Sequence, residues 1–514
     1  MGSRLCELGI LNDRGPSGET SPFDPIAGSN VWQDARNQLS RLVVTRGICS
    51  PPAALGDNGM VGSQQSGVPT VDLAVAGRIA NELIGHGTWT RDKLLAHQNE
   101  QLSAFLRRAA NHSPYYREMI GDLVAKGRPL AEYPIMNKTK LMANFDRIVT
   151  DPLLTRQLVE QHVNSEHCGE LLLDKYRCIA TGGSTGQRGL FVYDRDAWTL
   201  NAANQMRIQR MMGITPDMRG LGIGAPSPVH MSYRFHAEFR ASRPGAPTLF
   251  VTSPIEEIVT ALNAYQPDYL NAYPSLIRRL AEEQKAGRLR IMPKLFRSAA
   301  EALAPDVKDL VKEVWDAPIA DGYTATETGI MAVDCEHRSG MHICEDLVIL
   351  EVVDAKNRPV PDGTQGAKML ATVLFNHTLP VIRYEFSDLI TLSDGTCPCG
   401  RPFRRIQRIE GRAEEILRFR TGAGTIAEVH AARLWFHLVR VAGIRQYQFG
   451  ALPDGIWIRL AVDGSCNRGN VESEAKAIAA SALEDLAISG ARIDIEFVET
   501  IDRVGGGAKE KIVG

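Results

Sequence analysis

Apolar residues recur at helical spacing in several long stretches of the chain, and these stretches predict helices. Four leucines recur at helix-like spacing over residues 89–119, namely Leu94, Leu95, Leu102 and Leu106, and the helical stretch is expected to end in a turn at residues 112–114. This helix serves packing rather than chemistry. Two further helices are predicted, one from Arg195 to Met212 and one after an N-cap at Asn137.

Three later segments alternate strand-like and helix-like runs. They read YQPDYLNAYPSLIRRL from Tyr265, PKLFRSAAEA from Pro293 and APIADGYTATETG from Ala317. Such alternation is typical of a layered α/β domain. In that architecture the loops at the carboxyl ends of the strands form the ligand site. We therefore predict an α/β fold whose site includes the loop between Asp321 and Glu327.

The first part of the chain lacks this periodicity. It is rich in Gly, Pro, Ser and Asn, as in GPSGETSPFDPIAGSN. This composition predicts a largely disordered extension over residues 1–75, with rough helical spacing only near residues 31–44. No functional residue is expected in the extension.

A glycine-rich turn is predicted between two short strands in the segment CIATGGSTGQRGLFVY, from Cys178 to Tyr193. Its glycines allow backbone N–H groups to converge, and Ser184 and Thr185 add hydroxyl groups, so the turn can enclose an anion such as a triphosphate. A Walker-type P-loop is excluded because no Gly-Lys-Ser/Thr follows and the next residues favour a strand. An ordinary hairpin turn is the alternative.

Carboxylates lie beside two other predicted strands. Glu327 follows the strand that leads into Asp321, where Mg²⁺ can bridge a carboxylate to phosphate oxygens; the alternative is that Glu327 caps a helix. The run LPVIRYEFSDLITL predicts a strand ending in Arg383, Tyr384 and Asp388, and this aspartate suits ribose hydroxyl groups. The chain ends in RVGGGAKEKIVG, in which a lysine on a glycine-rich segment can move onto a reacting centre.

Composition places the chain among ordinary globular proteins of two or more domains. It has 514 residues, of which 44% are hydrophobic and 23% are charged. The net charge of -2 gives no support for nucleic-acid or membrane binding, and we find neither a long apolar run nor a secretory signal pattern. We predict a cytoplasmic protein. The nine cysteines, an odd number, predict reduced thiols rather than a disulfide framework.

Taken in order, five segments resemble the adenylate-forming enzyme superfamily, and within it the phenylacetate–CoA ligase-like branch. They are the glycine-rich turn, DGYTATETG, VIRYEFSDL, RIEGRAEE and GGGAKEK. The resemblance covers roughly residues 90–514. It implies a large adenylation domain of layered β-sheets and helices over residues 76–412, followed by a small, mobile α+β lid domain over residues 413–514.

The resemblance also implies roles for individual residues. Tyr323 would lie at the adenine, Asp388 at the ribose, and Arg412 near the nucleotide. Thr326 and Glu327 would act at the phosphates and Mg²⁺ and belong to the catalytic set. The other residues implied are the phosphate-binding Thr181, Gly182, Gly183, Ser184, Thr185 and Gly186, the nucleotide-binding Glu301, the hinge pivot Glu414 and the catalytic Lys509.

The implied reaction is ATP-dependent activation of a carboxylic acid, aryl or arylacetic, as an acyl-adenylate, followed by transfer to CoA. The implied cofactors are ATP, Mg²⁺, structural Zn²⁺ and CoA, and a homodimer is one expected assembly. The acid pocket is expected to draw on residues 224–233 and 271–275. Three residues in or near these segments could line the acid pocket, namely His230, Tyr233 and His236. Surface or core positions for these side chains are the alternative.

The chain departs from the family pattern at several positions. Gln187 replaces the lysine of the phosphate loop, and Glu414 and Glu415 replace hinge aspartates. The segment RFRTGAGTIAEV differs from the one that guides the pantetheine arm of CoA in this branch. An amide-forming synthetase that passes the acyl group to an amine is therefore an alternative, and a nucleotide-binding protein without turnover is a third. Lys511, two residues from Lys509, is a second candidate for the catalytic lysine.

Four residues are assigned to a structural zinc site. CPCG places Cys397 and Cys399 close together, a spacing that suits one metal ion, and Cys335 and His342 lie upstream. Some members of the same branch resemble this arrangement. A set of four protein ligands leaves no open position, which favours a structural metal. His337 is the competing ligand, and unpaired buried cysteines are the alternative.

Overall fold

The computed structural model describes residues 70–514 except 182–187, 241–242, 422–423, 432–433, 435–437, 439–440, 442, 465, 502, 505–508, 511–512 and 514. Most of the predicted extension lies outside this part. Its last residues are ordered, because α2 (Leu73–Gly85) begins inside it, with the Asp72 side chain accepting hydrogen bonds from Ala74 N and Val75 N. No helix in the described part has both the length and the apolar character needed to cross a membrane.

The helices predicted from apolar spacing are present. The helical stretch divides where expected, because Ser113 caps a new helix and Pro114 occupies its first turn. Asn137 caps the next helix through Lys140 N, as predicted. The helices before the first sheet are α3 (Arg91–His112), α4 (Pro114–Ala125), α5 (Lys138–Ala143), α6 (Phe145–Ile148) and α7 (Arg156–Val163), with short 3₁₀ turns η1 (His86–Thr88) and η2 (Leu130–Glu132).

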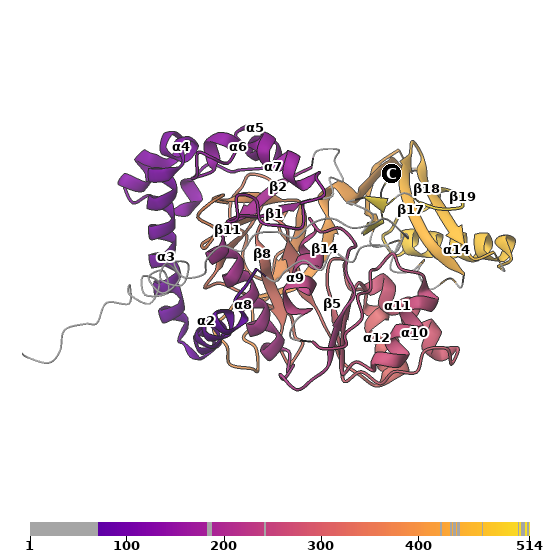
Figure 1. The fold of residues 1–514 in the computed structure, drawn as a ribbon. Coiled ribbons are helices and arrows are strands. Elements are labelled where there is room, and N and C mark those ends of the chain that lie inside the picture. Colours follow the sequence, from indigo (N-terminus) through magenta and orange to yellow (C-terminus); the bar gives the residue numbers. More distant parts are fainter. Residues whose placement is uncertain are drawn as a thin grey trace, which may run out of the picture. The chain divides into compact units, whose positions relative to one another are not determined.

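The predicted α/β layering is confirmed in a four-stranded parallel sheet of order β3-β4-β5-β6. Helices α10 and α11 connect consecutive strands along the chain and gather with α12 beside β5 (Figure 1). The strands are β3 (Gly220–Gly222), β4 (Tyr269–Ala272), β5 (Leu295–Ser298) and β6 (Ile319–Ala320), and the helices are α8 (Arg195–Met211), α9 (Met231–Arg240), α10 (Ile255–Tyr265), α11 (Pro274–Lys285) and α12 (Pro305–Trp315).

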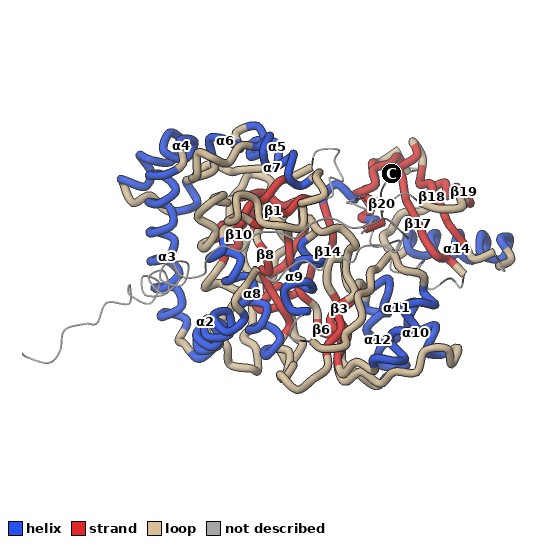
Figure 2. The backbone as a smooth tube through the Cα atoms, viewed as in Figure 1, coloured by secondary structure: helices blue, strands red, loops and turns tan. Residues whose placement is uncertain are grey.

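Antiparallel strands occur both before and after the parallel sheet in the chain. Figure 2 shows strands of the antiparallel sheets, in red, in the middle of the view, with α3 and α4 to their left. The five-stranded sheet has the order β13-β14-β9-β8-β7, the three-stranded sheet the order β10-β11-β12, and β1 and β2 form a hairpin. The strands are β1 (Arg177–Ala180), β2 (Leu190–Tyr193), β7 (Gly322–Ala325), β8 (Gly329–Asp334), β9 (Met341–Ile343), β10 (Val348–Val353), β11 (Lys368–Val373), β12 (Tyr384–Phe386), β13 (Asp388–Leu392) and β14 (Arg405–Arg412).

The prediction of one apolar strand that ends in Arg383, Tyr384 and Asp388 is wrong for its apolar part. Residues 379–383 are not in a strand; Tyr384 begins β12 and Asp388 begins β13. Pro380 has no N–H group to give to a sheet, and Arg383 has a left-handed φ of 45°. The buried Arg383 guanidinium pairs with Glu351 at 3.0 Å and donates to the carbonyl of Tyr133 at 2.6 Å. These contacts of one side chain outweigh the strand preference of its apolar neighbours.

The C-terminal part contains α and β elements, as the resemblance implies. In its three-stranded sheet β17 pairs antiparallel with β18, while β18 and β19 are parallel and are connected through α14. This crossover is the usual way to join parallel neighbours. The elements are η3 (Ala413–Glu415), β15 (Ile416–Arg420), β16 (Ile426–His430), β17 (Ile444–Leu452), β18 (Gly455–Val462), α14 (Arg468–Glu484), β19 (Arg492–Phe497), β20 (Arg503–Val504) and β21 (Lys509–Glu510).

One buried carboxylate holds the beginning of the described chain. Glu238 in α9 is only 2% exposed. It accepts hydrogen bonds from the backbone and the hydroxyl group of Thr70, both at 2.7 Å, and from the indole of Trp198 at 3.0 Å. Arg177 on β1 adds a buried ion pair to Glu238 at 3.4 Å. The segment before α2 is therefore part of the folded unit.

Candidate active site and metal centre

A cavity of about 1350 Å³ collects most of the predicted site residues. Its walls come from the β1–β2 hairpin, the carboxyl ends of the parallel strands, and the edges of the five-stranded sheet. Gly182 to Gly186 fall outside the described residues, and so does Lys511. For Lys509 the structure describes the backbone alone, in β21. The predicted residues that line the cavity are Thr181, Glu301, Tyr323, Thr326, Glu327, Asp388, Arg412 and Glu414.

The glycine-rich segment is anchored as a hairpin on both sides. Strands β1 and β2 pair antiparallel from Arg177↔Tyr193 to Ala180↔Leu190. Beyond them Thr181 N donates to the Gly189 carbonyl at 2.9 Å, and Gly189 N donates to the Thr181 hydroxyl at 2.8 Å. The last described residue before the loop therefore has a fixed position on the cavity wall.

The turn that carries Thr326 and Glu327 joins two antiparallel strands, β7 and β8. No helix follows Glu327, so the alternative that this residue caps a helix is wrong. Tyr193 on β2 donates its hydroxyl to the Thr326 carbonyl at 2.8 Å, which fastens the turn to the hairpin. Gly329 closes the turn with a φ of +72°, and a Cβ there would lie 2.0 Å from Asn201 Oδ1, so only glycine fits.

Glu327 lies at the base of the cavity, with 9% of its surface exposed. Tyr384 donates its hydroxyl to Glu327 Oε1 at 3.5 Å. Burial raises the pKa of the Glu327 carboxyl above its ordinary value, because the charged form loses hydration. A cation bound at this carboxyl would favour its ionised form.

Asp388, Arg412 and Tyr323 form a second group in the cavity. Asp388 begins β13 and Arg412 ends β14, where their Cα atoms are register partners, and Arg412 Nε lies 3.7 Å from Asp388 Oδ1. Burial, followed by the charge of Asp388, raises the pKa of Tyr323 well above its ordinary value. The group presents a carboxylate, a guanidinium and an aromatic ring, which suit ribose hydroxyls, phosphate and a base.

Glu301 contacts the first turn of α11. Its carboxylate accepts hydrogen bonds from Ser275 N at 3.0 Å and from the Ser275 hydroxyl at 3.1 Å. Both residues line the cavity, so the predicted segment 271–275 does reach it. His230 and His236 line the same cavity, while Tyr233 lines a smaller one beside it.

Sequence reasoning missed Arg297, which also lines the cavity. It is 5% exposed and lies on β5, between residues of the parallel sheet. The signal was present, because Arg297 places a charge directly after the apolar pair Leu295 and Phe296. Its burial follows from the neighbouring strands, which the local sequence does not reveal.

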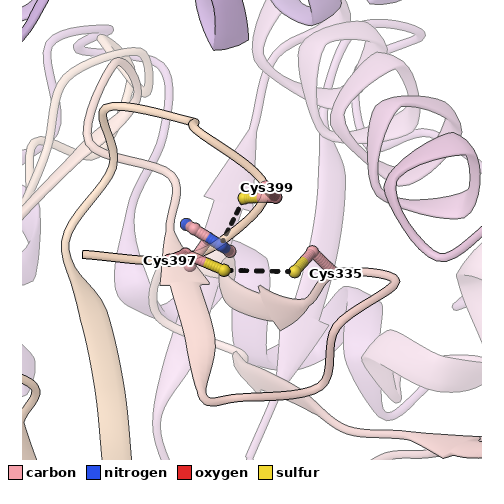
Figure 3. Close-up of side chains that lie close together, drawn as sticks. Cys335, Cys397 and Cys399 are labelled. Carbon is pink, nitrogen blue, oxygen red and sulfur yellow. Dashed lines mark hydrogen bonds between the residues drawn. The ribbon is translucent and has the colours of Figure 1, made fainter. Parts of the chain in front are cut away.

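The predicted metal ligands come together in one cluster (Figure 3). Cys335 follows β8, His342 lies on β9, and Cys397 and Cys399 lie in the loop between β13 and β14. The four ligand atoms lie within 4.8 Å of one another. Cys335 Sγ and Cys397 Sγ are 3.7 Å apart, which is too far for a disulfide and close to the spacing of thiolates around one zinc ion.

His342 is oriented for ligation. Its Nδ1 lies 3.2 Å from the Phe403 carbonyl, so Nδ1 carries the proton, and Nε2 lies 3.3 Å from Cys399 Sγ. The competing His337 contributes only its backbone N–H, which donates to Cys335 Sγ at 3.4 Å, and its side chain is exposed. The three thiols and one imidazole of the cluster are donors that suit zinc. The residues of the cluster fit a four-coordinate metal.

One protein-family model matches a part of the chain that contributes to the cavity. The model described as "AMP-binding enzyme" matches residues 174–371. The match includes the glycine-rich hairpin, the parallel sheet, and the turn that carries Thr326 and Glu327.

Individual relatives resemble the chain over longer stretches. Phenylacetate-coenzyme A ligase of Pseudomonas putida is 26% identical over 353 residues, 63% of this chain and 72% of the relative. Fumarate--(S)-2,3-diaminopropanoate ligase of Enterobacter agglomerans is 23% identical over 286 residues, 52% of this chain and 68% of the relative. The solved structure of 2-hydroxyisobutyryl-CoA ligase with 2-HIB-AMP has a TM-score of 0.64 at 21% identity, covering 81% of this chain and 89% of that chain.

Proposed function

Because the chain belongs to the adenylate-forming superfamily, in its phenylacetate–CoA ligase-like branch, we propose that it activates a carboxylic acid with ATP and transfers the acyl group to CoA. The enzyme class is an AMP-forming acid ligase. The observation that carries the proposal is the convergence of the described nucleotide-binding candidates, from five separate segments, on one cavity. An aryl or arylacetic acid is the expected substrate class from the resemblance alone.

The reaction has two displacement steps. In the first, a carboxylate oxygen attacks the α-phosphorus of ATP, and the bond to the β-phosphate oxygen breaks to release pyrophosphate. In the second, the thiol sulfur of CoA attacks the acyl carbon, the bond to AMP breaks, and the thiol proton is lost to solvent or a base. Both steps develop negative charge on oxygen, which positioned donors and cations stabilise.

The cavity residues supply such groups. We assign Tyr323 to the adenine, Asp388 to the ribose, and the glycine-rich loop to the phosphates. Thr326 and Glu327 would hold a Mg²⁺ ion, which would supply positive charge for the phosphates and would offset the cost of burying the Glu327 charge. We assign Lys509 to the oxygens of the acid and the α-phosphate.

The cysteine and histidine cluster is proposed to hold one structural Zn²⁺. The support is the donor set, the close approach of the four atoms and the oriented His342. The ion would link the loop between β13 and β14 to β8 and β9. That linkage would fix Asp388 and Arg412, which lie on β13 and β14, relative to the turn after β7.

A cytoplasmic location and a homodimer stay predictions from the sequence.

An amine is the second candidate for the acceptor. The segment after the hinge departs from the pattern associated with CoA, and one relative is named as a ligase of fumarate and an amine. In this version the amine nitrogen attacks the acyl-adenylate, loses a proton and releases AMP. The first half of the reaction is unchanged.

Acid-dependent exchange of pyrophosphate into ATP tests the first half without any acceptor. We expect at least one acid from a panel of aryl, arylacetic, short-chain, dicarboxylic and amino acids to raise exchange above the acid-free control by about 100-fold or more. Adding CoA or an amine then identifies the acceptor from the product mass. Nucleotide binding with no exchange for any acid would instead support a binding protein without turnover.

A further inference from the structure

Arg297 occupies an unusual position for a cation. It is the third residue of β5 and lines the large cavity, with 5% of its surface exposed. Its register partners are Asn271 on β4 and Ala320 on β6. Register partners in parallel strands point to the same face of a sheet, so the guanidinium and the Asn271 amide face the cavity together.

The Arg297 guanidinium has no directly bonded partner among the described residues. Arg297 Nε is buried without a hydrogen-bond partner, and in the described part of the chain no hydrogen bond or ion pair involves this side chain. The carboxyl of Asp321 acts on it through charge alone, since Asp321 accepts hydrogen bonds from Ser298 at 2.5 Å and from Gly322 N at 3.0 Å. Burial lowers the pKa of Arg297 to about 10, so the side chain stays charged at neutral pH.

A second cation lies near this position. Arg243 lines the same cavity, and its Nη2 donates to the Tyr269 hydroxyl at 2.7 Å. The positive charge of Arg243 also contributes to lowering the pKa of Arg297. No ion pair in the described part of the chain joins Arg243 to a carboxylate. Two cations without a paired carboxylate make this end of the cavity attractive to an anion.

Apolar side chains contribute to the wall of the same cavity. Apolar residues Met231, Phe235 and Phe239 of α9 line the cavity as well, and His236 of the same helix lies 3.2 Å from the Asn271 amide. The site therefore combines an apolar wall with a cationic end. Uncompensated charges in such surroundings cost free energy, and a bound anion removes that cost.

We propose that the acid activated by this chain is a dicarboxylic acid, and that Arg297 binds the carboxylate that is not activated. The inference rests on the proposed function, since it places the substrate in the same cavity. A guanidinium presents two parallel N–H donors that match a carboxylate, which is why arginine suits this role better than lysine. Arg243 adds a second positive charge near the same carboxylate.

Matched acids test the inference in the wild-type protein. Pyrophosphate exchange is measured with dicarboxylic acids of four to eight carbons and with carboxyphenylacetic acid, each beside its monoamide. The monoamide keeps the size and the reacting carboxylate but removes the second charge. We expect the best diacid to exceed its monoamide by about 100-fold in kcat/KM, as for other buried charge-assisted contacts.

Variants then assign the preference to one side chain. Arg297→Met is expected to lower kcat/KM for the diacid by about 100-fold while leaving that for the monoamide within about threefold, and Arg297→Lys should recover part of the loss. The matched control is Arg290→Met, an exposed arginine before the same strand, which should change neither value. Nucleotide binding and thermal unfolding report whether each variant is folded.

The outcomes separate the two proposals. Equal exchange with diacids and monoamides in the wild type, or an unchanged preference in folded Arg297→Met, would overturn the dicarboxylate inference and leave adenylation intact. Absence of exchange with every acid would overturn the proposed function itself. If Arg297→Met does not fold, the preference of the wild type and of Arg297→Lys decides the matter.

Discussion

Replacing Lys509 with alanine is expected to lower acid-dependent pyrophosphate exchange by about 100- to 1,000-fold, while transfer from preformed acyl-adenylate stays within about threefold of wild type. The reason is that an ammonium group bridging the acid and the α-phosphate stabilises charge in the first step only. Lys509 lies on β21, where its backbone pairs with Val504 of β20 in a short hairpin. Exchange and single-turnover transfer measure the two halves separately.

Lys511 provides the matched control for this prediction. It lies two residues away on the same segment. Lys511→Ala therefore removes the same charge from the same part of the chain. We expect this variant to retain exchange. Reversal of the two results would transfer the catalytic role to Lys511, and equal loss of both half-reactions in Lys509→Ala would contradict the assignment.

The purified protein is expected to contain one zinc ion per chain, and Cys397→Ser or Cys335→Ser should remove most of it. Loss of one thiolate from a four-ligand set lowers zinc affinity strongly, and the apparent unfolding temperature should fall by about 5 to 10 °C. Elemental analysis gives the zinc content, and thermal unfolding of the same samples gives the stability. Prolonged chelation of the wild type should reproduce both changes.

Cys168→Ser is the control for the zinc experiment. Cys168 is a partly buried free thiol outside the cluster, so its replacement should leave both the zinc content and the unfolding temperature unchanged. A wild-type protein without zinc after expression in zinc-containing medium, and with unchanged stability in Cys397→Ser, would show that the four residues are ordinary buried side chains.

The order of short motifs carried most of the information about the active site. Tyr323 and Glu327 lie in the motif DGYTATETG, and Asp388 lies in the motif VIRYEFSDL. The structure places all three residues in one cavity. His342 and His337 were not separable by spacing, since both lie within seven residues of Cys335. The difference arises in three dimensions, where pairing of β9 with β14 buries His342 beside the Phe403 carbonyl.

Tertiary contacts explain what the sequence could not predict. The strand expected before Arg383 fails because a buried ion pair with Glu351 fixes a backbone conformation that no strand has. Arg297 escaped notice because its strand has only four residues, and its isolation depends on partners from β4 and β6. In both cases the sequence shows a charged residue next to apolar ones. The contacts that surround its side chain come from segments distant in sequence, so they could not be predicted locally.

The carboxylate of Glu238 sets a limit on how far the chain can be shortened for crystallisation. A version that begins at Leu73 removes three hydrogen bonds to this carboxylate, those from Thr70 N, the Thr70 hydroxyl and Val71 N. Of the described partners, Arg177 and Trp198 would then remain for the buried charge. A trimmed protein for structural work should therefore start upstream of Thr70, so that the three hydrogen bonds from the segment before α2 to Glu238 of α9 are retained.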